Sequence, residues 1–419
     1  MRFSFLIASA IASALASPIA ITGCYRPAAI GDCEIGCESG ACPTGLSCGA
    51  DRLCFANGGP ACNDVTLDAG SDAAIVDGSD VPTCIGSFVQ VCFRMPLVLP
   101  DLQLVATLDT DSTSGCLDDA TVFTVPADPK ACVVAGQNVT VTGAVRAVGS
   151  RPLIIVALGE LHFDAALDVS TNRGANVGPG VVASAVDCNT NGITGSSTTT
   201  IGGGGGAGGT FQGRGGMGGG GDVNGQKGGA SSAMLPAPTI LGPGCKGGNG
   251  GDKFLNSTHL GGTGGLPGGV IALIASTITV EPGVVIAAGG GGGEAGADAA
   301  GGGGGGAGGL IVFDAQSITN NGRVQANGGG GASGSAIGGA GAVGGNGGTN
   351  IALGGDSGLS SNDGNGGTGS ISSNLTGAPG FMAQADQSGG GGGGGAGFIL
   401  VRGMTILGAG TFSPPYFAL

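Results

Sequence analysis

The residues of this chain whose type and spacing point most clearly to chemistry are its cysteines. The chain has 13 cysteines in 419 residues, which is an odd number. Twelve of them fall into blocks of six, four and two, at Cys33, Cys37, Cys42, Cys48, Cys54 and Cys62, at Cys84, Cys92, Cys116 and Cys132, and at Cys188 and Cys245. An exported chain enters an oxidising compartment, so we expect these twelve to form disulfides within their blocks.

A zinc site is the alternative use of the first block. That block contains no histidine, and its spacing lacks the paired Cys-x-x-Cys of zinc ligands. Residues 33–54, CEIGCESGACPTGLSCGADRLC, also hold too few apolar side chains to bury a core. Because a segment this small needs covalent staples to keep one shape, disulfides are favoured, with their pairing left open.

The first 23 residues have the composition of a secretory signal. Arg2 is their only charge, and residues 3–15 form an apolar run that is too short and too interrupted by serine to span a membrane as a helix. Two cleavage positions compete. Ala14-Leu15-Ala16 is an ordinary cleavage site, and the other position lies directly before Cys24.

Cys24 is the cysteine left over from the even blocks. Ile21-Thr22-Gly23-Cys24 resembles the lipobox of bacterial lipoproteins, which implies that Cys24 is acylated and becomes the first residue of the mature chain. Tyr25 follows it where an Asp would signal inner-membrane retention, and the rule for this family then implies the outer membrane. Residues 24–62 are similar to the small Cys-rich modules that follow the lipobox in many bacterial surface lipoproteins. The resemblance therefore implies a lipid-anchored chain at the bacterial surface.

Motifs that could carry catalysis or bind a cofactor are thin. Gly355-Asp356-Ser357-Gly358 is similar to the nucleophile signature of chymotrypsin-like proteases, but His162 and His259 lack the matching context. Residues 247–254 fit the calcium-binding nonapeptide GGxGxDxU once, and such a site needs adjacent repeats to complete its oxygen shell. We therefore expect no catalytic, cofactor-binding or metal-binding residues.

The overall composition narrows the class of protein. Glycine accounts for 98 of the 419 residues, tryptophan is absent, and only 10% of the residues are charged. Collagen is excluded because glycine does not recur at every third position and proline is scarce. The net charge of −14 and the lack of a basic cluster argue against nucleic acid and against docking on anionic lipid through charge.

The chain changes character twice before its repeats begin. Residues 63–83 carry five aspartates among Ala, Gly and Ser, which predicts a flexible linker. A calcium-binding EF-hand loop starting at Asp68 fails, because Gly70 stands at a ligand position and Ala73 where glycine is needed. Residues 84–150 are β-rich, and we expect strands in them at residues 87–93, 120–125, 131–135 and 138–148.

One unit is written twice in the second half of the chain. Residues 268–292 read GGVIALIASTITVEPGVVIAAGGGG, and residues 308–331 read GGLIVFDAQSITNNGRVQANGGGG. Degenerate copies cover residues 153–170 and 397–412. In the first copy three short runs, at 270–275, 277–280 and 284–287, are separated by corners at Ser276 and at residues 281–283. About twenty residues with three strands and tight corners correspond to one coil of a parallel β-helix.

A single coil cannot bury its apolar face alone, so it must stack on neighbours. Stacking places like residues on like, and the alignment puts Leu161, Ile278, Ile318 and Ile406 at one equivalent position. We therefore predict an all-β chain in which residues 151–419 form a parallel β-helix or solenoid. A β-sandwich with glycine-rich insertions is the alternative.

Long glycine-rich tracts separate the copies, at residues 172–267, 289–309 and 327–396. The simplest arrangement is that each tract loops out at one corner and returns in register. Such tracts are ordinarily flexible, but these are rich in Ala and short of Ser and charge. Glycine chains also form extended polyglycine-II helices of the polyproline-II kind, whose N–H and C=O groups must pair with neighbouring chains. The sequence leaves ordered polyglycine helices and disordered loops equally open.

Parallel β-helices host polysaccharide lyases and hydrolases, whose sites place carboxylates with Arg or Lys on one sheet face. Here the candidate residues look scattered, with no pair at equivalent positions in adjacent coils: Asp164, Asp168, Glu281, Asp314 and Arg323. We therefore expect a non-enzymatic cell-surface lipoprotein with a structural or adhesive role and no cofactor. Its partners would be the membrane, through the lipid, and envelope polysaccharide or other surface proteins, without nucleic acid. A carbohydrate-active β-helix enzyme and a polysaccharide-binding module are the alternatives.

Overall fold

The structure is a computed structural model, and it describes residues 46–48, 54–56 and most of residues 82–419. Within residues 82–419 the segments outside the description are 95–97, 113–114, 118–120, 126–129, 175, 182–187, 189–191, 199–201, 223–225, 254–258, 349, 359–363 and 385–386. The predicted signal, Cys24, the linker up to residue 81, and the cysteines of the first block other than Cys48 and Cys54 also lie outside the described residues.

The chain divides into two compact units, Met1–Ile75 and Val76–Leu419. In the first unit, strands β1 (Leu46–Cys48) and β2 (Cys54–Ala56) pair antiparallel, with Cys48 opposite Cys54. The boundary between the units falls inside the aspartate-rich segment 63–83, where the sequence predicts a linker.

The second unit is all-β, since its described residues form strands and turns but no helix. Three strands, β3 (Thr83–Ile85), β4 (Gln90–Phe93) and β7 (Val122–Val125), make a small antiparallel sheet. The other named strands of this unit pair in parallel. Nothing in the described part of the chain is a helix long and apolar enough to cross a membrane.

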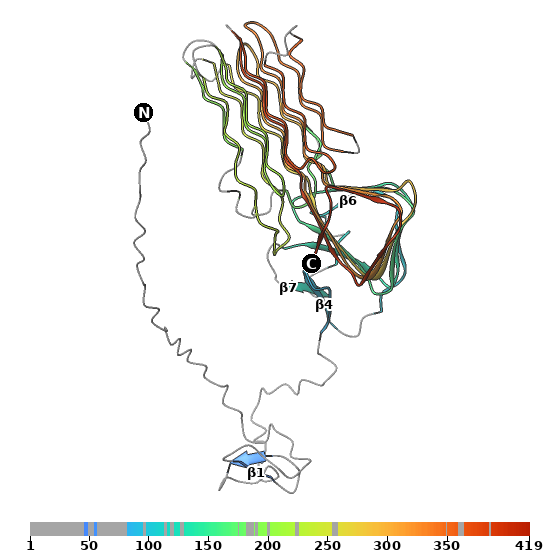
Figure 1. The fold of residues 1–419 in the computed structure, drawn as a ribbon. Helices are drawn as coiled ribbons and strands as arrows, with labels where there is room; N and C mark the ends of the chain where they lie inside the picture. The colour runs from blue at the N-terminus through green and yellow to red at the C-terminus, as the bar shows by residue number, and fades with distance from the viewer. Residues whose placement is uncertain are drawn as a thin grey trace, which may run out of the picture. The chain divides into compact units, whose positions relative to one another are not determined.

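The parallel strands follow one another in sets of three (Figure 1). Strands at the same position in successive sets pair side by side. The sets are β8 (Cys132–Gly136), β9 (Val139–Val141) and β10 (Val145–Val148); β11 (Leu153–Ala157), β12 (Glu160–Phe163) and β13 (Leu167–Asp168); β14 (Val270–Val280), which fills two positions, and β15 (Val285–Ala287); β16 (Leu310–Asn320), which also fills two, and β17 (Arg323–Gln325); and β18 (Phe398–Arg402), β19 (Thr405–Leu407) and β20 (Thr411–Ser413). Shorter strands flank them, namely β5 (Leu102–Leu104), β6 (Leu108–Asp109) and β21 (Phe417–Ala418). We call these parallel strands the strand stack.

The register of the strand stack places equivalent residues side by side. Leu161 pairs with Ile278, Ile278 with Ile318, and Ile318 with Ile406, which confirms the column predicted from the repeats. Leu161, Ile278 and Ile318 are fully buried, and Ile406 is partly buried against the same core. Val139 of β9 pairs with Leu161 and extends the column. Burial of branched apolar side chains in one line is therefore repeated from set to set.

Several predicted strand limits differ from the structure. The predicted strands 87–93 and 120–125 begin later, as β4 at Gln90 and β7 at Val122. Residues 270–275 and 277–280 form one strand, β14, although its pairing with β16 leaves out Ser276. The predicted strand 138–148 is divided into β9 and β10, because the N–H groups of Thr142 and Gly143 both donate to the carbonyl of Leu104 and turn the chain. Strands β8 to β10 already pair in parallel with β11 to β13, so stacking begins before residue 151.

The strand stack has a hydrophobic core on each face of its first strand position. In β14, Ile271 and Leu273 belong to the inner core, while Val270, Ala272 and Ile274 belong to the outer one. A strand buried on both faces reads as a continuous apolar run, which is why residues 270–275 do not alternate. The outer core is closed by residues of the glycine tracts and of the antiparallel sheet, including Phe211, Leu241, Ala307, Phe93 and Val122.

The glycine-rich tracts leave the strand stack after its third strand position and return before the first, as the sequence predicts. They lie together as extended chains beside the strand stack, in the upper part of Figure 1. We call the described residues of 188–267, 289–309 and 327–397 the glycine body. Its chains are ordered by backbone hydrogen bonds between segments, so the disordered-loop alternative is wrong for the described residues.

The hydrogen bonds of segment 301–308 show how the glycine body is built. Its N–H groups point to three neighbouring segments in turn, with the direction repeating every third residue. Gly301, Gly304 and Ala307 donate to Gly251, Gly248 and Cys245; Gly302, Gly305 and Gly308 donate to Gly389, Gly392 and Gly395; and Gly303 and Gly306 donate to Glu294 and Gly291. Three further segments, around residues 206–209, 262–268 and 329–332, donate to its carbonyls. The segment therefore has six neighbours.

Packing at this distance requires glycine. A Cβ added to Gly304 would lie 2.0 Å from the carbonyl oxygen of Ala207, and one added to Gly305 would lie 2.1 Å from that of Gly329. These separations are far below any van der Waals contact. A side chain at such a position would force neighbouring segments apart and stretch their hydrogen bonds.

Candidate functional site

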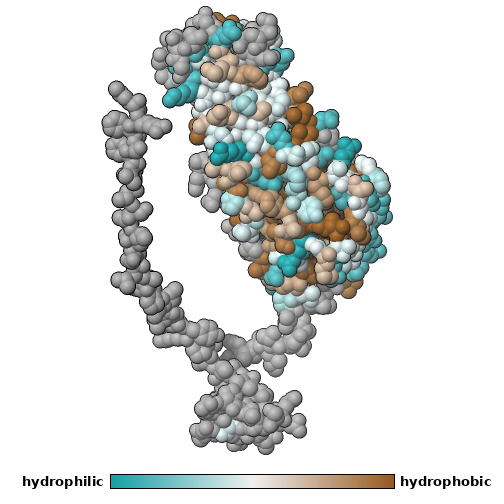
Figure 2. Space-filling view, in the orientation of Figure 1, coloured by the Kyte–Doolittle hydropathy of each residue, from teal (hydrophilic) through white to brown (hydrophobic). Residues whose placement is uncertain are grey.

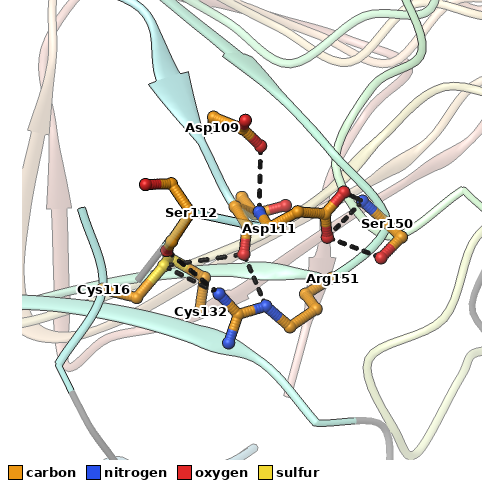
Figure 3. The surroundings of a disulfide bond; sticks show 8 residues. Asp109, Asp111, Ser112, Cys116, Cys132, Ser150 and Arg151 are labelled. Atoms are coloured by element: carbon orange, nitrogen blue, oxygen red, sulfur yellow. Dashed lines mark hydrogen bonds between the residues drawn. A yellow bond between two sulfur atoms is a disulfide. The ribbon is translucent and has the colours of Figure 1, made fainter. Parts of the chain in front are cut away.

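A disulfide and an arginine close the N-terminal end of the strand stack (Figure 3). Cys116 is bonded to Cys132, the first residue of β8. Arg151, which precedes β11, donates from Nη2 to Cys116 Sγ at 3.2 Å. Beside it, the Asp111 carboxylate accepts from both the N–H and the Oγ of Ser150, at 2.9 and 2.6 Å. These contacts tie the loop after β6 to two successive sets of strands, which is a structural role.

Two further disulfides lie among the described residues. Cys84 and Cys92 are joined across the pair β3–β4, and Cys188 is joined to buried Cys245 within the first glycine tract. Each bond connects cysteines of one sequence block. The described disulfides therefore hold the antiparallel sheet, the strand stack and the glycine body, one in each.

The strand stack brings one histidine and three carboxylates together. His162 of β12 lies between Glu160, whose Oε1 is 3.2 Å from Nδ1, and Asp164, whose Oδ1 is 2.9 Å from Nε2. Glu281, from the next set of strands, lies 3.6 Å from the same Nε2. Burial alone would lower the pKa of His162, but the hydrogen bonds to Glu160 and Asp164 and their negative charges raise it above its usual value. The sequence alone did not reveal this cluster.

Two charged pairs at equivalent positions correct the expectation that no such pair exists. Arg146 of β10 is in register with Asp168 of β13, and their side chains form an ion pair. Asp314 of β16 is in register with Arg402 of β18. Arg323 fits the earlier expectation, since its cross-strand neighbours are Val285 and Thr411. The pairs arise because parallel stacking aligns residues that lie 22 or more positions apart in the sequence.

Asp314 has a second function in the fold. Its Oδ2 accepts hydrogen bonds from the N–H and Oγ of Ser87 and from the N–H of Phe88, at 2.5, 2.7 and 3.2 Å. These bonds fasten the β3–β4 turn to the strand stack. A groove of about 610 Å³ beside this contact is lined by corner residues of four successive sets, among them Leu158, Ser276, Gln316 and Met404.

The two short motifs of the glycine tracts are used for local structure. In the protease-like motif, Gly358 N–H donates to Asp356 Oδ1 and Ser357 N–H donates to Asn365 Oδ1. In the nonapeptide, Asn249 Oδ1 accepts from Gly264 N–H at 3.0 Å and Asp252 Oδ1 from Gly261 N–H at 2.8 Å. One side-chain oxygen each of Asn249 and Asp252 is therefore engaged with a backbone N–H group. Across the described residues, no group of three or more His, Cys, Asp or Glu side chains could hold a metal ion.

His259 and Lys253 lie near one end of the glycine body. Lys253 is buried, and its Nζ is 3.0 Å from Asp298 Oδ1, while His259 Nδ1 is 3.0 Å from Asp298 Oδ2. A hydrogen bond from the N–H of Gly338, followed by that from Lys253, lowers the pKa of Asp298. Asp298 sits in a tight turn with φ of 48°, and the ion pairs fix that turn.

A pocket of about 440 Å³ lies where the glycine tracts meet the strand stack. Its walls are residues 171–174 and Val177, which follow β13, residues 263–266, which precede β14, and Gly291, Gly292 and Glu294, which follow β15, together with Lys246 of the first glycine tract. Arg173, Lys246 and Glu294 are its charged residues, and we call it the basic pocket. Nothing in the spacing of Arg173 and Lys246 along the sequence brings them together, so sequence reasoning missed this site.

Compared with models of protein families, with curated proteins and with solved structures, the chain gives no match.

Proposed function

We propose that this chain is a lipid-anchored protein of the bacterial outer membrane or cell surface, with a structural or adhesive role. Its strand stack would be a parallel β-helix, and its glycine tracts helices of the polyglycine-II type. Sets of three parallel strands in register support the first assignment. Hydrogen bonds that turn to the same neighbour at every third residue support the second, because such a helix has three residues per turn and no internal hydrogen bonds.

The six-neighbour packing of segment 301–308 is the observation that carries the proposed role. Because each segment satisfies its backbone groups on other segments, backbone hydrogen bonds would order the glycine body where side chains are absent. An ordered body of this kind can hold a few large side chains in fixed positions on its surface. In the view of Figure 2, a pale surface is interrupted by strongly hydrophobic side chains. The exposed apolar residues of the glycine body include Met217, Met234, Leu260, Ile337, Leu353, Phe381 and Met382.

Three of these residues lie on two hydrogen-bonded segments, and we call them the apolar patch: Met217, Phe381 and Met382. The segments are joined by a bond of 2.8 Å from Gly380 N–H to Met217 O, and the three side chains are 56%, 51% and 73% exposed. Exposed apolar patches commonly mark contact surfaces. Replacing all three by Ser should reduce retention of the purified chain on an octyl-coated surface by about tenfold. Leu260→Ser removes one exposed apolar side chain elsewhere and should change retention little. Equal retention of the wild type, the triple variant and Leu260→Ser would refute adhesion through this patch.

The proposed location rests on the cysteines and the leader. Disulfides in the described residues suit an oxidising compartment outside the cytoplasm. The lipobox-like Ile21-Thr22-Gly23-Cys24 suggests an acyl anchor at Cys24. Expressed with its own leader in a Gram-negative host, the wild-type chain should enter the detergent phase and be labelled by an impermeant biotin reagent on intact cells. Cys24→Ser should move the chain to the aqueous phase, and unchanged partitioning would exclude the anchor.

A second candidate is a carbohydrate-active enzyme, and the cluster around His162 favours it. The cluster combines three carboxylates with a histidine of raised pKa at the surface of parallel strands, a set of groups able to transfer protons. The test is incubation of the purified chain with a panel of acidic polysaccharides, assayed for reducing ends and unsaturated products. Activity that Glu160→Gln abolishes would establish the enzyme in place of the structural role.

A further inference from the structure

The basic pocket concentrates positive charge in an acidic chain. It is lined by two of the 14 basic residues, Arg173 and Lys246, and by a single acid, Glu294. One positive charge is therefore in excess, whereas the chain as a whole carries −14. Two cations that line one concave pocket focus a positive potential there, which attracts an anion small enough to enter.

Arg173 has hydrogen-bonding capacity to spare. Its Nε lies 3.7 Å from Glu294 Oε1, which is longer than a hydrogen bond, and that carboxylate is 42% exposed. Its Nη1 is buried and has no acceptor among the described residues. Nη1 itself is closed off from solvent, but the Arg173 side chain is 30% exposed, so an anionic oxygen in the pocket can approach the accessible part of the guanidinium.

The backbone around Arg173 is held in place from outside the pocket. Asn346, from the third glycine tract, accepts from the N–H of Arg173 and from the N–H of Gly292, each at 3.0 Å. One amide oxygen thus fixes two walls of the pocket relative to each other. The cation is therefore presented by a preorganised backbone, which lowers the entropic cost of binding.

We propose that the basic pocket binds the carboxylate of a hexuronate unit in an acidic polysaccharide. Arg173 and Lys246 would bind the carboxylate, since guanidinium matches its two oxygens. Asn172 and the exposed Thr263 offer polar groups for ring hydroxyls, and Leu266 offers apolar contact for the C–H face of the ring. A volume of about 440 Å³ suits one sugar ring and far exceeds that of inorganic phosphate. This inference rests on the proposed adhesive role, because a location at the cell surface would bring the pocket into contact with such a polysaccharide.

Calorimetric titration of the full chain in detergent tests the ligand class. Glucuronate or galacturonate should bind, and glucose and galactose, which lack the carboxylate, should bind about tenfold more weakly or not at all. Polygalacturonate should bind at least as tightly per sugar unit as the monomer. Binding of the monomer alone would overturn the polymer assignment, and inorganic phosphate binding as tightly as uronate would overturn the sugar assignment.

Variants of the pocket test the residues. Arg173→Gln should weaken uronate binding by about tenfold, and Glu294→Gln should tighten it several-fold by removing the competing carboxylate. Tightening cannot result from misfolding, so Glu294→Gln keeps the test decisive if Arg173→Gln fails to fold. Arg214→Gln, at an exposed cation of the glycine body outside the pocket, is the control and should leave affinity unchanged. Equal losses in Arg173→Gln and Arg214→Gln would refute the site.

The experiments can reject the proposed function and the proposed binding site independently of each other. Absence of uronate binding by a chain that is labelled on intact cells would reject the pocket and leave the surface role. Uronate binding by a chain that is not labelled on intact cells would reject the surface role and leave the pocket.

Discussion

The substitution Gly304→Ala tests the packing of the glycine body most directly. Gly304 lies in the segment with six neighbours, its N–H donates to Gly248 O at 2.9 Å, and its carbonyl accepts from Gly265 N–H at 2.8 Å. The added Cβ would stand 2.0 Å from the carbonyl oxygen of Ala207 and 2.5 Å from its carbon. Restoring an ordinary contact requires a shift of more than about 1 Å between two segments.

The magnitude follows from the bonds that such a shift stretches. Two backbone hydrogen bonds at about 1 kcal/mol each, together with overpacking of about 1–3 kcal/mol, oppose the substitution. Loss of glycine freedom in the unfolded chain offsets about 0.4–1 kcal/mol of this. We expect a net loss of about 3 kcal/mol in the stability of the glycine body, which corresponds to roughly hundredfold faster amide exchange.

The control is Gly348→Ala in the third tract. A Cβ added to Gly348 meets nothing within 4 Å, and its φ lies outside the left-handed region. This variant should change stability by less than about 0.5 kcal/mol. Hydrogen exchange read by mass spectrometry on peptides covering residues 301–308 is the assay. Equal exchange in the two variants would show that the tracts are loosely packed, against the reasoning from backbone contacts.

Three further predictions concern the strand stack and the disulfides. Ile278→Ala and Ile318→Ala should each lower the free energy of unfolding by about 2–5 kcal/mol, measured by thermal unfolding. Because the two residues pair in register, the double variant should depart from additivity by about 0.5 kcal/mol or more. Additive effects would contradict their contact. Because the pKa of His162 is raised, its pairing stabilises the fold below the unfolded pKa of about 6.5 and is lost as pH rises through the folded value. Wild type should therefore lose more stability than His162→Gln between about pH 6 and pH 8, and parallel profiles would exclude this. Removing the Cys188–Cys245 bond, which spans 57 positions, by the double substitution to Ser should destabilise the glycine body by about 4 kcal/mol in denaturant unfolding; an unchanged midpoint would contradict it.

The sequence predicts the register of the strand stack because two copies of the repeat align along their whole length. Once Ile278 is matched to Ile318, parallel stacking requires each to lie beside the other, and the same alignment extends to Leu161 and Ile406. The all-β class and the parallel pairing thus follow from the pattern of apolar runs. The continuity of β14 past Ser276 cannot be predicted in this way, because the sequence does not distinguish one unpaired residue within a strand from a corner between two strands.

The Arg146–Asp168 pair can be predicted from the sequence if the alignment of the repeats is extended toward the N-terminus. Val145-Arg146 and Leu167-Asp168 are third-position strands of successive sets, in register with each other. Both consist of a buried apolar residue followed by a charged one. An alignment of residues 138–148 with the later copies places Arg146 beside Asp168, but the similarity of this short segment to the repeat is weak.

The order of the glycine body could not be predicted from the sequence, for a physical reason. A helix or a strand shows apolar periodicity because it buries one face. An extended glycine chain has no side chains to bury and no hydrogen bonds within itself, so its sequence carries no local signal for or against order. Whether Gly304 has partners depends on Gly248 and Gly265, which are distant in the chain. The same limit hid the basic pocket, whose lining comes from three crossings between the tracts and the strand stack and from Lys246 within the first tract.

The strand stack supplies the register that the glycine body cannot supply itself. Residues before β14 donate to those before β16, and these donate to those before β18, through Gly268 N–H to Ala307 O and Gly308 N–H to Gly395 O. This order repeats that of the strands, in which β14 lies beside β16 and β16 beside β18. Stretches made of glycine alone present no side chains that would set their register, so the aligned strands at their ends help to fix it. The sequences that directly precede β14, β16 and β18 are GGTGGLPGG, GGGGGGAGG and GGGGGGAG. They are nearly identical because each must pack on the next at the same distance from an aligned strand.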